Sequence, residues 1–393
     1  MILRDTSARG IPALCRHGAG GRNDLLSLGE IGHMMIMIDP ALKRLLEKAT
    51  QMHASDLHLT VGIPPAVRVN SDLIVLGDEE RLRPEDTQEM MFSVISEENL
   101  AQFRRDGEVD FSFGLSEIGR FRVNMYRQRG SVAAAVRIMG GRIPSPEELG
   151  LPQSVVDLCS RPSGLVLVTG PTGSGKSTTL ASLIQRINET RRCHVLTLED
   201  PIEFLYRHDR ALVDQREIGL DSMSFAAALR AALREDPDVI MVGEMRDNET
   251  IATALTAAET GHLVFSTLHT NDAASTIGRI IDVFPDAQRA QVRTQLSMVL
   301  DAVVSQRLLP REDQEGRIAC FEVMHCTTAI RSLIRDNKAF QIHSVIQTGS
   351  KAGMITMEES MLQAVRRGDI SAQTALEFAP DPQIMSQRIN SMH

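Results

Sequence analysis

The chain has 393 residues, with 42 lysines and arginines against 51 aspartates and glutamates, and a formal net charge of −9. This length suffices for two domains with separate cores, and the acidic balance argues against a nucleic acid as the main partner. No apolar run reaches the roughly 18 residues that span a bilayer. The five cysteines are scattered and odd in number, which is typical of reduced thiols. We therefore expect a cytoplasmic protein.

The first part of the chain predicts a small α+β domain over residues 38–140. Residues 1–37 show no clear period, so we leave them unassigned as an extension that we expect to be disordered. Beyond them, helical spacing and strict alternation of apolar residues mark successive elements. The expected elements are a helix from residue 40, strands at 55–59 and 121–126, a hairpin-like stretch at 66–73, and a helix at 84–100.

The second part predicts an α/β domain over residues 164–349, after a linker at 141–163 that begins rich in glycine and proline. Apolar strand candidates alternate there with helices, which is typical of a mostly parallel sheet. Beyond Phe284 the spacing of apolar residues, through Val303 and Val304, predicts helix, and residues 350–393 predict a helical segment with a tail. The strand candidates are 165–169, 193–198, 238–242 and 262–268.

Eight residues, from Gly170 to Ser177, fit the phosphate-loop pattern G-x-x-x-x-G-K-[ST] without a mismatch, and Thr178 extends the candidate loop to nine. An apolar strand precedes them and an amphipathic helix follows, so backbone N–H groups and the helix dipole would point at an anion. Lys176 would contact the β- and γ-phosphates, and Ser177 would coordinate Mg²⁺. A dinucleotide-binding loop is excluded, because it needs a glycine where Thr178 stands. The nine residues are Gly170, Pro171, Thr172, Gly173, Ser174, Gly175, Lys176, Ser177 and Thr178.

Hydrolysis needs further groups, and three stretches at predicted strand ends supply candidates. Glu203 belongs to an acidic stretch after the second strand, and Glu244 ends an apolar strand in a Walker B arrangement. His262 and His269 lie at opposite ends of the next strand. We expect His269 to sense phosphate, with His262 a weaker candidate. The ordinary alternatives are solvated surface carboxylates and structural histidines.

Arginines concentrate on the predicted strand at 121–126. Arg120 and Arg122 share one face of it while apolar residues share the other, and Arg137 follows close behind. A solvated strand face is the ordinary explanation. Because arginine fingers stabilise phosphoryl transfer, this cluster in an acidic chain also suggests a nucleotide site completed between subunits.

Together these motifs resemble the secretion-superfamily ATPases, most closely the PilT-type ATPases that retract type IV pili. The resemblance runs from about residue 40 to about residue 378. It rests on residues 55–59, 119–124 and the phosphate loop, on 197–203 (similar to the family's Asp box), 243–247 (Walker B), 259–269 (His box) and 329–335 (a helix linked to retraction).

The resemblance implies a PAS-like N-terminal domain, a RecA-like P-loop domain with C-terminal helices, and a homo-hexamer that uses ATP and Mg²⁺. By the same likeness Glu203 would polarise the attacking water and Glu244 would hold Mg²⁺. Arg122 and Arg137 would be the arginines that reach the nucleotide.

The implied function is a motor for pilus retraction, with pilin disassembly and twitching motility as its result. It would act at the inner face of the inner membrane, peripheral and not spanning, against the platform protein of a pilus machine. Two alternatives stay open: an accessory paralogue that hydrolyses weakly beside a motor paralogue, and a pilus assembly or type II secretion ATPase. Those assembly and secretion relatives usually carry a four-cysteine metal site, which this sequence lacks.

The helix at 329–335 makes a separate prediction. Arg331 and Arg335 lie four residues apart, opposite Ile330, Leu333 and Ile334. This periodicity predicts an exposed basic stripe on an amphipathic helix.

Overall fold

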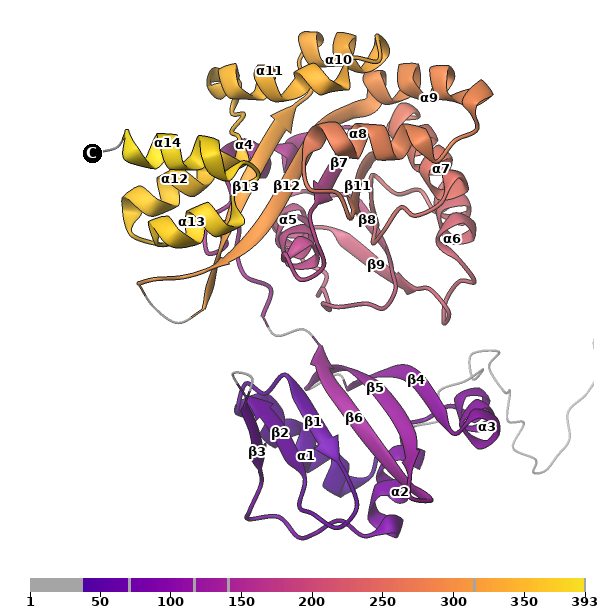
Figure 1. The fold of residues 1–393 in the computed structure, drawn as a ribbon. Helices are drawn as coiled ribbons and strands as arrows, with labels where there is room; N and C mark the ends of the chain where they lie inside the picture. The colour runs from indigo at the N-terminus through magenta and orange to yellow at the C-terminus, as the bar shows by residue number, and fades with distance from the viewer. Residues whose placement is uncertain (1–37, 70–71, 116–117, 140–141, 314–315, 392–393) are drawn as a thin grey trace, which may run out of the picture.

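The structure is a computed structural model that describes residues 38–69, 72–115, 118–139, 142–313 and 316–391. The disorder expected for residues 1–37 lies outside this range. The described chain forms two parts, each built on its own sheet: an N-terminal part (residues 38–139) and a C-terminal part (residues 142–391) (Figure 1). None of the described helices is long and apolar enough to cross a membrane.

The N-terminal part is an antiparallel sheet with helices packed on one face. Among the described residues the sheet has six strands in the order β3-β2-β1-β6-β5-β4. Its elements are α1 (Pro40–Gln51), β1 (Asp56–Leu59), β2 (Ala66–Val69), β3 (Asp72–Val75), α2 (Pro84–Phe92), α3 (Glu97–Asp106), β4 (Glu108–Leu115), β5 (Gly119–Gln128) and β6 (Ser131–Met139).

Two sequence predictions for this part have different outcomes. The alternation on β5 is confirmed, because Phe121, Val123 and Met125 are fully buried while Arg122 is exposed. The single helix predicted over 84–100 is wrong, since the chain forms α2 and α3 there. The break has a local cause: the Ser96 hydroxyl caps α3 by accepting a hydrogen bond from the backbone N–H of Asn99.

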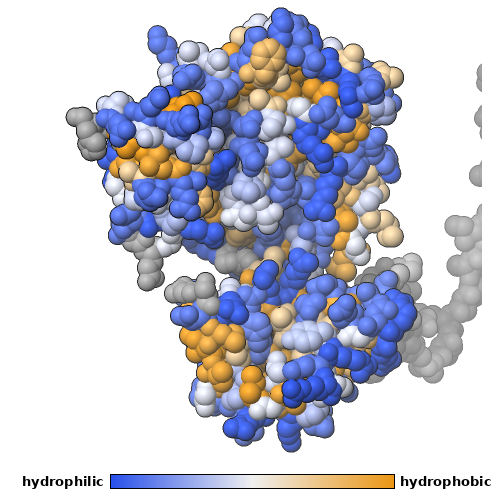
Figure 2. Space-filling view, viewed as in Figure 1, coloured by the Kyte–Doolittle hydropathy of each residue, from blue (hydrophilic) through white to orange (hydrophobic). Residues whose placement is uncertain are grey.

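One edge of the N-terminal sheet is apolar and open. β3 pairs only with β2 among the described strands, and its Leu73, Ile74 and Val75 are exposed by 56%, 41% and 49%. Orange side chains gather over this edge at the left of the N-terminal part in Figure 2. Native proteins usually cover or charge such edges.

The C-terminal part is a mostly parallel sheet, as predicted. Its described strands follow the order β13-β12-β7-β11-β10-β8-β9, and only the β12–β13 pair is antiparallel. The elements up to the last strand are α4 (Gln153–Val156), β7 (Gly164–Thr169), α5 (Lys176–Thr190), β8 (His194–Glu199), β9 (Leu212–Glu217), α6 (Phe225–Ala232), β10 (Val239–Val242), α7 (Asn248–Glu259), β11 (Leu263–Leu268), α8 (Ala273–Asp282), α9 (Asp286–Val299), β12 (Leu300–Pro310) and β13 (Arg317–His325). Helices α10 (Thr328–Arg335), α11 (Ile342–Thr348), α12 (Met357–Arg367), α13 (Ala372–Phe378) and α14 (Pro382–Asn390) follow.

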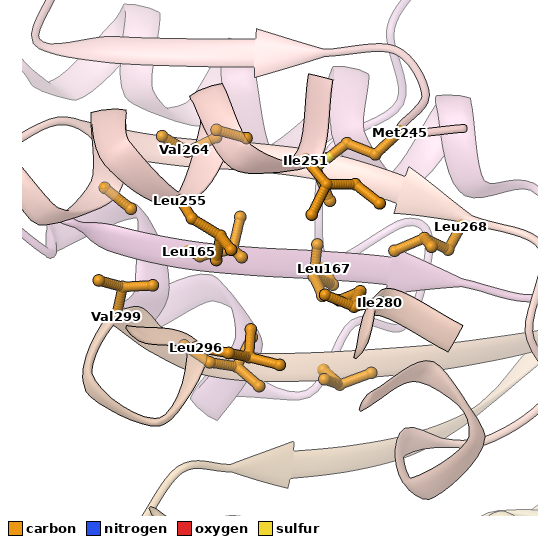
Figure 3. Close-up of a cluster of buried hydrophobic side chains, with 14 of the residues drawn as sticks. Leu165, Leu167, Met245, Ile251, Leu255, Val264, Leu268, Ile280, Leu296 and Val299 are labelled. Carbon is orange, nitrogen blue, oxygen red and sulfur yellow. The ribbon is translucent and has the colours of Figure 1, made fainter. Parts of the chain in front are cut away.

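Helices cover both faces of this sheet, which explains why its central strands are continuous apolar runs. Every residue of β7 and of β11 is buried. Figure 3 shows one of the buried clusters, in which Leu165 and Leu167 of β7 and Val264 and Leu268 of β11 pack against helices α7, α8 and α9. The helix side chains labelled there are Ile251, Leu255, Ile280, Leu296 and Val299.

The helix predicted beyond Phe284 extends too far. α9 ends at Val299, and Val303 and Val304 belong to β12, where both are fully buried. β12 lies between β7 and β13 and is covered on both faces, so its sequence lacks the alternation that marks a strand. Val292, Leu296, Val299 and Val303, spaced three or four residues apart across the end of α9 and the start of β12, therefore give a helical pattern.

The prediction of an exposed basic stripe on α10 is wrong for one of its two arginines. Arg335 is exposed, but Arg331 is half-buried. Its guanidinium donates to the carbonyl oxygens of Ser297 and Met298 at 2.8 and 2.6 Å and to Asp301 at 3.0 Å. Arg331 therefore fixes α10 to the C-terminal end of α9, where carbonyl groups lack helical partners.

Candidate functional site

The phosphate loop joins the C-terminal end of β7 to the first residue of α5. Gly170, Gly173 and Gly175 have φ values of +146°, +76° and +89°, which favour glycine. A side chain on Gly170 would clash with the backbone carbonyl of Gln306, and a Cβ on Gly175 would lie 2.8 Å from the Gln306 side-chain nitrogen. The loop therefore packs directly on β12, with the N-terminus of α5 at its end.

Lys176 lies at the centre of this loop. Its Nζ donates to the carbonyl oxygens of Gly170 and Pro171 at 2.9 and 3.0 Å and lies 3.5 Å from Nδ1 of His269. Burial lowers the pKa of Lys176, while the carboxylates of Glu244 and Glu203 act in the opposite direction. The ammonium group is thus a desolvated donor beside two acidic side chains.

Glu244 and His269 meet because β10 and β11 are neighbours and end at the same sheet edge. The Glu244 carboxylate lies 2.7 Å from Nη2 of Arg246 and 3.3 Å from Nε2 of His269. Burial alone would raise the pKa of Glu244, but the hydrogen bond from Arg246 and the charges of Arg246, His269 and Lys176 lower it. His269 therefore links the phosphate-loop lysine to an ionised carboxylate.

Glu203 is carried by the loop after β8 and is held by a buried glutamate. Its backbone N–H donates to Glu199 Oε2 at 3.3 Å. The Glu199 carboxyl also accepts from the Thr197 hydroxyl at 2.7 Å and from the Gln215 amide at 3.2 Å. Burial raises the pKa of Glu199. Glu199 thus supports the loop, while the half-buried Glu203 lines the adjoining cavity.

The phosphate loop and the acidic side chains surround one cavity of about 470 Å³. This volume lies within the range of small-molecule sites. The cavity combines amide and ammonium donors on one wall with carboxylates on the other, an arrangement suited to a phosphate group and a water or cation. Its lining includes Thr172, Gly173, Gly175, Lys176, Ser177, Thr178, Glu199, Glu203, Tyr206, Phe225, Glu244, Arg246, His269, Leu308 and Arg317.

Comparisons with known proteins agree with this geometry. The family model described as "Type II/IV secretion system protein" matches residues 34–377. The chain belongs to this family. It is 48% identical to a "Twitching motility protein" of Neisseria gonorrhoeae over 82% of this chain and 86% of that protein. It is 45% identical to the "Type IV pilus retractation ATPase PilT" of Pseudomonas aeruginosa over 87% of this chain and 99% of that protein.

A solved structure described as the pilus retraction motor PilT with bound ADP is 52% identical, with a TM-score of 0.82. The match covers 88% of this chain and 98% of the solved one. This member of the type II/IV secretion system family therefore shares its mixed α/β fold with a relative whose solved structure holds ADP.

Not every predicted site residue of this secretion-family chain lies at the cavity. His262 precedes β11 at the opposite end of that strand, where its Nδ1 lies 2.9 Å from the Ala257 carbonyl oxygen. Arg122 and Arg137 lie directly opposite each other on β5 and β6 of the N-terminal sheet. None of these three lines the cavity. Of the phosphate loop, Gly170, Pro171 and Ser174 do not line the cavity either.

Sequence reasoning missed several residues that line the cavity or support the phosphate loop. Arg246 follows Glu244 closely enough that the motif could have indicated it. Tyr206 and Phe225 carry no motif signal. Gln306 packs under the phosphate loop and accepts from the Thr179 hydroxyl at 2.7 Å, but it lies on β12, which the sequence pattern assigned to a helix.

Proposed function

We propose that this chain is an ATP-hydrolysing motor that powers retraction of type IV pili. The single observation that carries the proposal is the convergence of Lys176, Glu203, Glu244 and His269 on one cavity beside the phosphate loop. The similar proteins are named as a twitching motility protein and pilus retraction ATPases, and these names favour retraction over assembly of the pilus.

In the proposed reaction the β- and γ-phosphates lie against the loop amides and the Lys176 ammonium. Ser177 and Glu244 would hold Mg²⁺, which when bound supplies positive charge to the phosphate oxygens. Glu203 orients a water and accepts a proton from it. The water oxygen attacks the γ-phosphorus, and the bond between that phosphorus and the bridging oxygen breaks, which releases ADP. His269 contacts Lys176 and Glu244 together, so it can register the γ-phosphate.

The proposal also includes the domain organisation, the oligomeric state and the location of the protein. The domain boundaries would be those of a PAS-like domain at 38–140, a linker at 141–163 and a RecA-like domain at 164–349, arranged in a homo-hexamer. Arg122 and Arg137 lie outside their own chain's cavity, which supports a role at a neighbouring subunit's nucleotide. The ring would lie in the cytoplasm at the inner membrane, against the platform protein of a pilus machine.

Steady-state hydrolysis by the purified protein tests the chemistry. We expect ATP turnover that requires Mg²⁺ and falls to background in Lys176→Ala. Glu203→Gln should bind nucleotide with parental affinity and lose about 10²- to 10⁴-fold in kcat, the usual contribution of a general base. Turnover of Glu203→Gln at the parental rate would contradict the role assigned to Glu203.

The direction of work is tested in cells. Deleting a retraction motor should leave cells with excess pili and without twitching motility. Cells without any pili would instead identify an assembly motor and overturn the proposal of retraction.

A further inference from the structure

One buried carboxylate joins the two parts of the chain. Glu217, the last residue of β9, has an exposed fraction of only 6%. Its carboxylate accepts from the Ser112 hydroxyl at 2.5 Å and forms an ion pair with Arg120, both from the N-terminal part. Arg120 Nη2 also donates to Ser112 at 2.9 Å, which closes a three-membered polar cluster between the two parts.

The same carboxylate holds the loop that carries Glu203. The backbone N–H of Ile202 donates to Glu217 Oε2 at 3.0 Å, one residue before Glu203. Ile202 is buried, so this hydrogen bond is shielded from water. The oxygen that receives the Arg120 guanidinium is therefore the oxygen that fixes the backbone next to Glu203.

Gln215, on the same face of β9 as Glu217, holds the loop on the C-terminal side of Glu203. Gln215 donates to the Phe204 carbonyl oxygen at 2.8 Å and accepts from the Tyr206 backbone N–H at 2.9 Å. Side chains two residues apart on a strand point the same way. Strand β9 thus holds the loop on both sides of Glu203, but only the Glu217 contact reaches the N-terminal part.

The charges give this junction an energetic consequence. The Arg120 and Glu217 side chains are exposed by only 14% and 8%. Removing one member of a buried ion pair leaves the other charge uncompensated in a poorly solvated site. If the N-terminal part moved away, Glu217 would lose its cation and its hydroxyl donor together, and water would compete for the hydrogen bond to Ile202.

We propose that Glu217 is a positioning residue that places Glu203 for hydrolysis only while Arg120 and Ser112 are docked against it. ATP cleavage in one subunit is then coupled to the position of its own N-terminal part. This inference rests on the proposed role of Glu203. It also separates Arg120, whose guanidinium is engaged within its own chain, from the exposed Arg122.

Arg120→Ala is the decisive variant, measured by hydrogen exchange of the full-length protein without nucleotide. We expect the amides of Ile202 and Glu203 to exchange at least about 10-fold faster, with little change elsewhere in the C-terminal part. The matched control is Arg44→Ala, which removes a bidentate pair to Glu79 (2.6 and 2.8 Å) inside the N-terminal part. Arg44→Ala should leave exchange at Ile202 at the parental rate.

Kinetics give the second readout. We expect Arg120→Ala to lower kcat by about 10- to 100-fold with KM for ATP nearly unchanged, because misplaced catalytic groups slow the chemical step more than they weaken binding. Arg120→Lys, which keeps the charge, should recover part of the lost rate. Adding Glu217→Gln to Arg120→Ala should cost less than Glu217→Gln costs alone, because the two residues act as one unit.

Each outcome decides the inference. Parental exchange at Ile202 in Arg120→Ala would overturn it, and so would a parental kcat or fully additive effects of the two substitutions. The exchange measurement does not depend on hydrolysis. If the parent protein hydrolysed no ATP, the proposed function would fail, while exchange would still decide whether Arg120 controls the backbone at Ile202.

Discussion

At the scale of single residues, Glu322 makes the stability of the C-terminal part depend on pH. This β13 side chain is only 4% exposed, and its Oε1 accepts from the Ala273 backbone N–H at 2.9 Å. Burial raises the pKa of Glu322 to about 7, with further contributions from the charges of Asp272 and Glu358. The folded protein therefore holds a proton on Glu322 that the unfolded chain releases near its ordinary pKa of 4.5.

Glu322→Gln should remove this pH dependence. In the parent, the stabilisation is complete below the unfolded pKa and is lost as the pH rises through the folded pKa of about 7. The neutral glutamine keeps an acceptor for Ala273 and carries no charge to bury. We expect the thermal midpoint of the variant to match the parent near pH 4 and to exceed it at pH 8, by the equivalent of up to about 3 kcal/mol.

The control for this experiment is Glu377→Gln, at an exposed glutamate on α13. Its midpoint should follow the parent at both pH values. If Glu322→Gln gained no stability between pH 4 and pH 8 relative to that control, burial of an acid at position 322 would not limit stability.

At the scale of elements, the phosphate loop depends on the strand beneath it. Gly175 is the N-cap residue of α5 and has a φ of +89°, and a Cβ there would lie 2.8 Å from the Gln306 side-chain nitrogen and 3.4 Å from Leu308. An alanine would meet both an unfavourable backbone conformation and a tight contact with β12. The loop must then shift away from the geometry in which its amides converge.

Gly175→Ala should therefore weaken nucleotide binding by about 10-fold or more, corresponding to at least about 1.4 kcal/mol. Titration with a fluorescent ATP analogue measures the change. Gly278→Ala is the matched control, because a Cβ on that α8 glycine would meet no atom within 4 Å and the residue lies in a helix. It should bind with parental affinity, with a gain in helix stability of about 0.5–1 kcal/mol. Parental binding by Gly175→Ala would contradict the argument.

The sequence was most informative where one element carries its own pattern. The phosphate loop, the buried strands β7 and β11 and the amphipathic α1 were predictable because each depends on local spacing. β12 was not, since burial on both faces removes alternation. The break before α3 depends on a single serine cap, and the position of Arg331 depends on carbonyl groups of α9 that are distant in sequence.

At the candidate site, the residues that belong to sequence motifs could be predicted, but the residues that hold them in place could not. Glu203, Glu244 and His269 follow strands β8, β10 and β11, whose C-terminal ends lie at one sheet edge, so topology brings them together. Gln306 and Glu217 act through contacts between elements far apart in sequence. No spacing rule marks such residues, because their role arises from packing.

At the scale of the whole molecule, two arginines are paired on the N-terminal sheet and do not line their own chain's cavity. Arg122 lies directly opposite Arg137, and like charges opposite each other destabilise a sheet. Asp56 compensates in part, since it accepts from Arg137 Nε at 3.0 Å. Both arginines are exposed. An anion from outside the chain, such as the nucleotide of an adjacent subunit, would relieve the remaining repulsion.

This arrangement predicts that two inactive variants restore each other in a mixed ring. The Lys176→Ala variant lacks the phosphate-loop lysine but keeps Arg122. The Arg122→Ala variant lacks the arginine but keeps the phosphate-loop lysine. Co-expressed with different tags and purified through both, the mixed oligomers should regain ATPase activity at about one site in four, where an intact loop meets an intact arginine from its neighbour. Each variant alone should stay inactive. Mixed rings no more active than the separate variants would show that Arg122 does not complete a neighbouring subunit's nucleotide site, which would contradict this prediction.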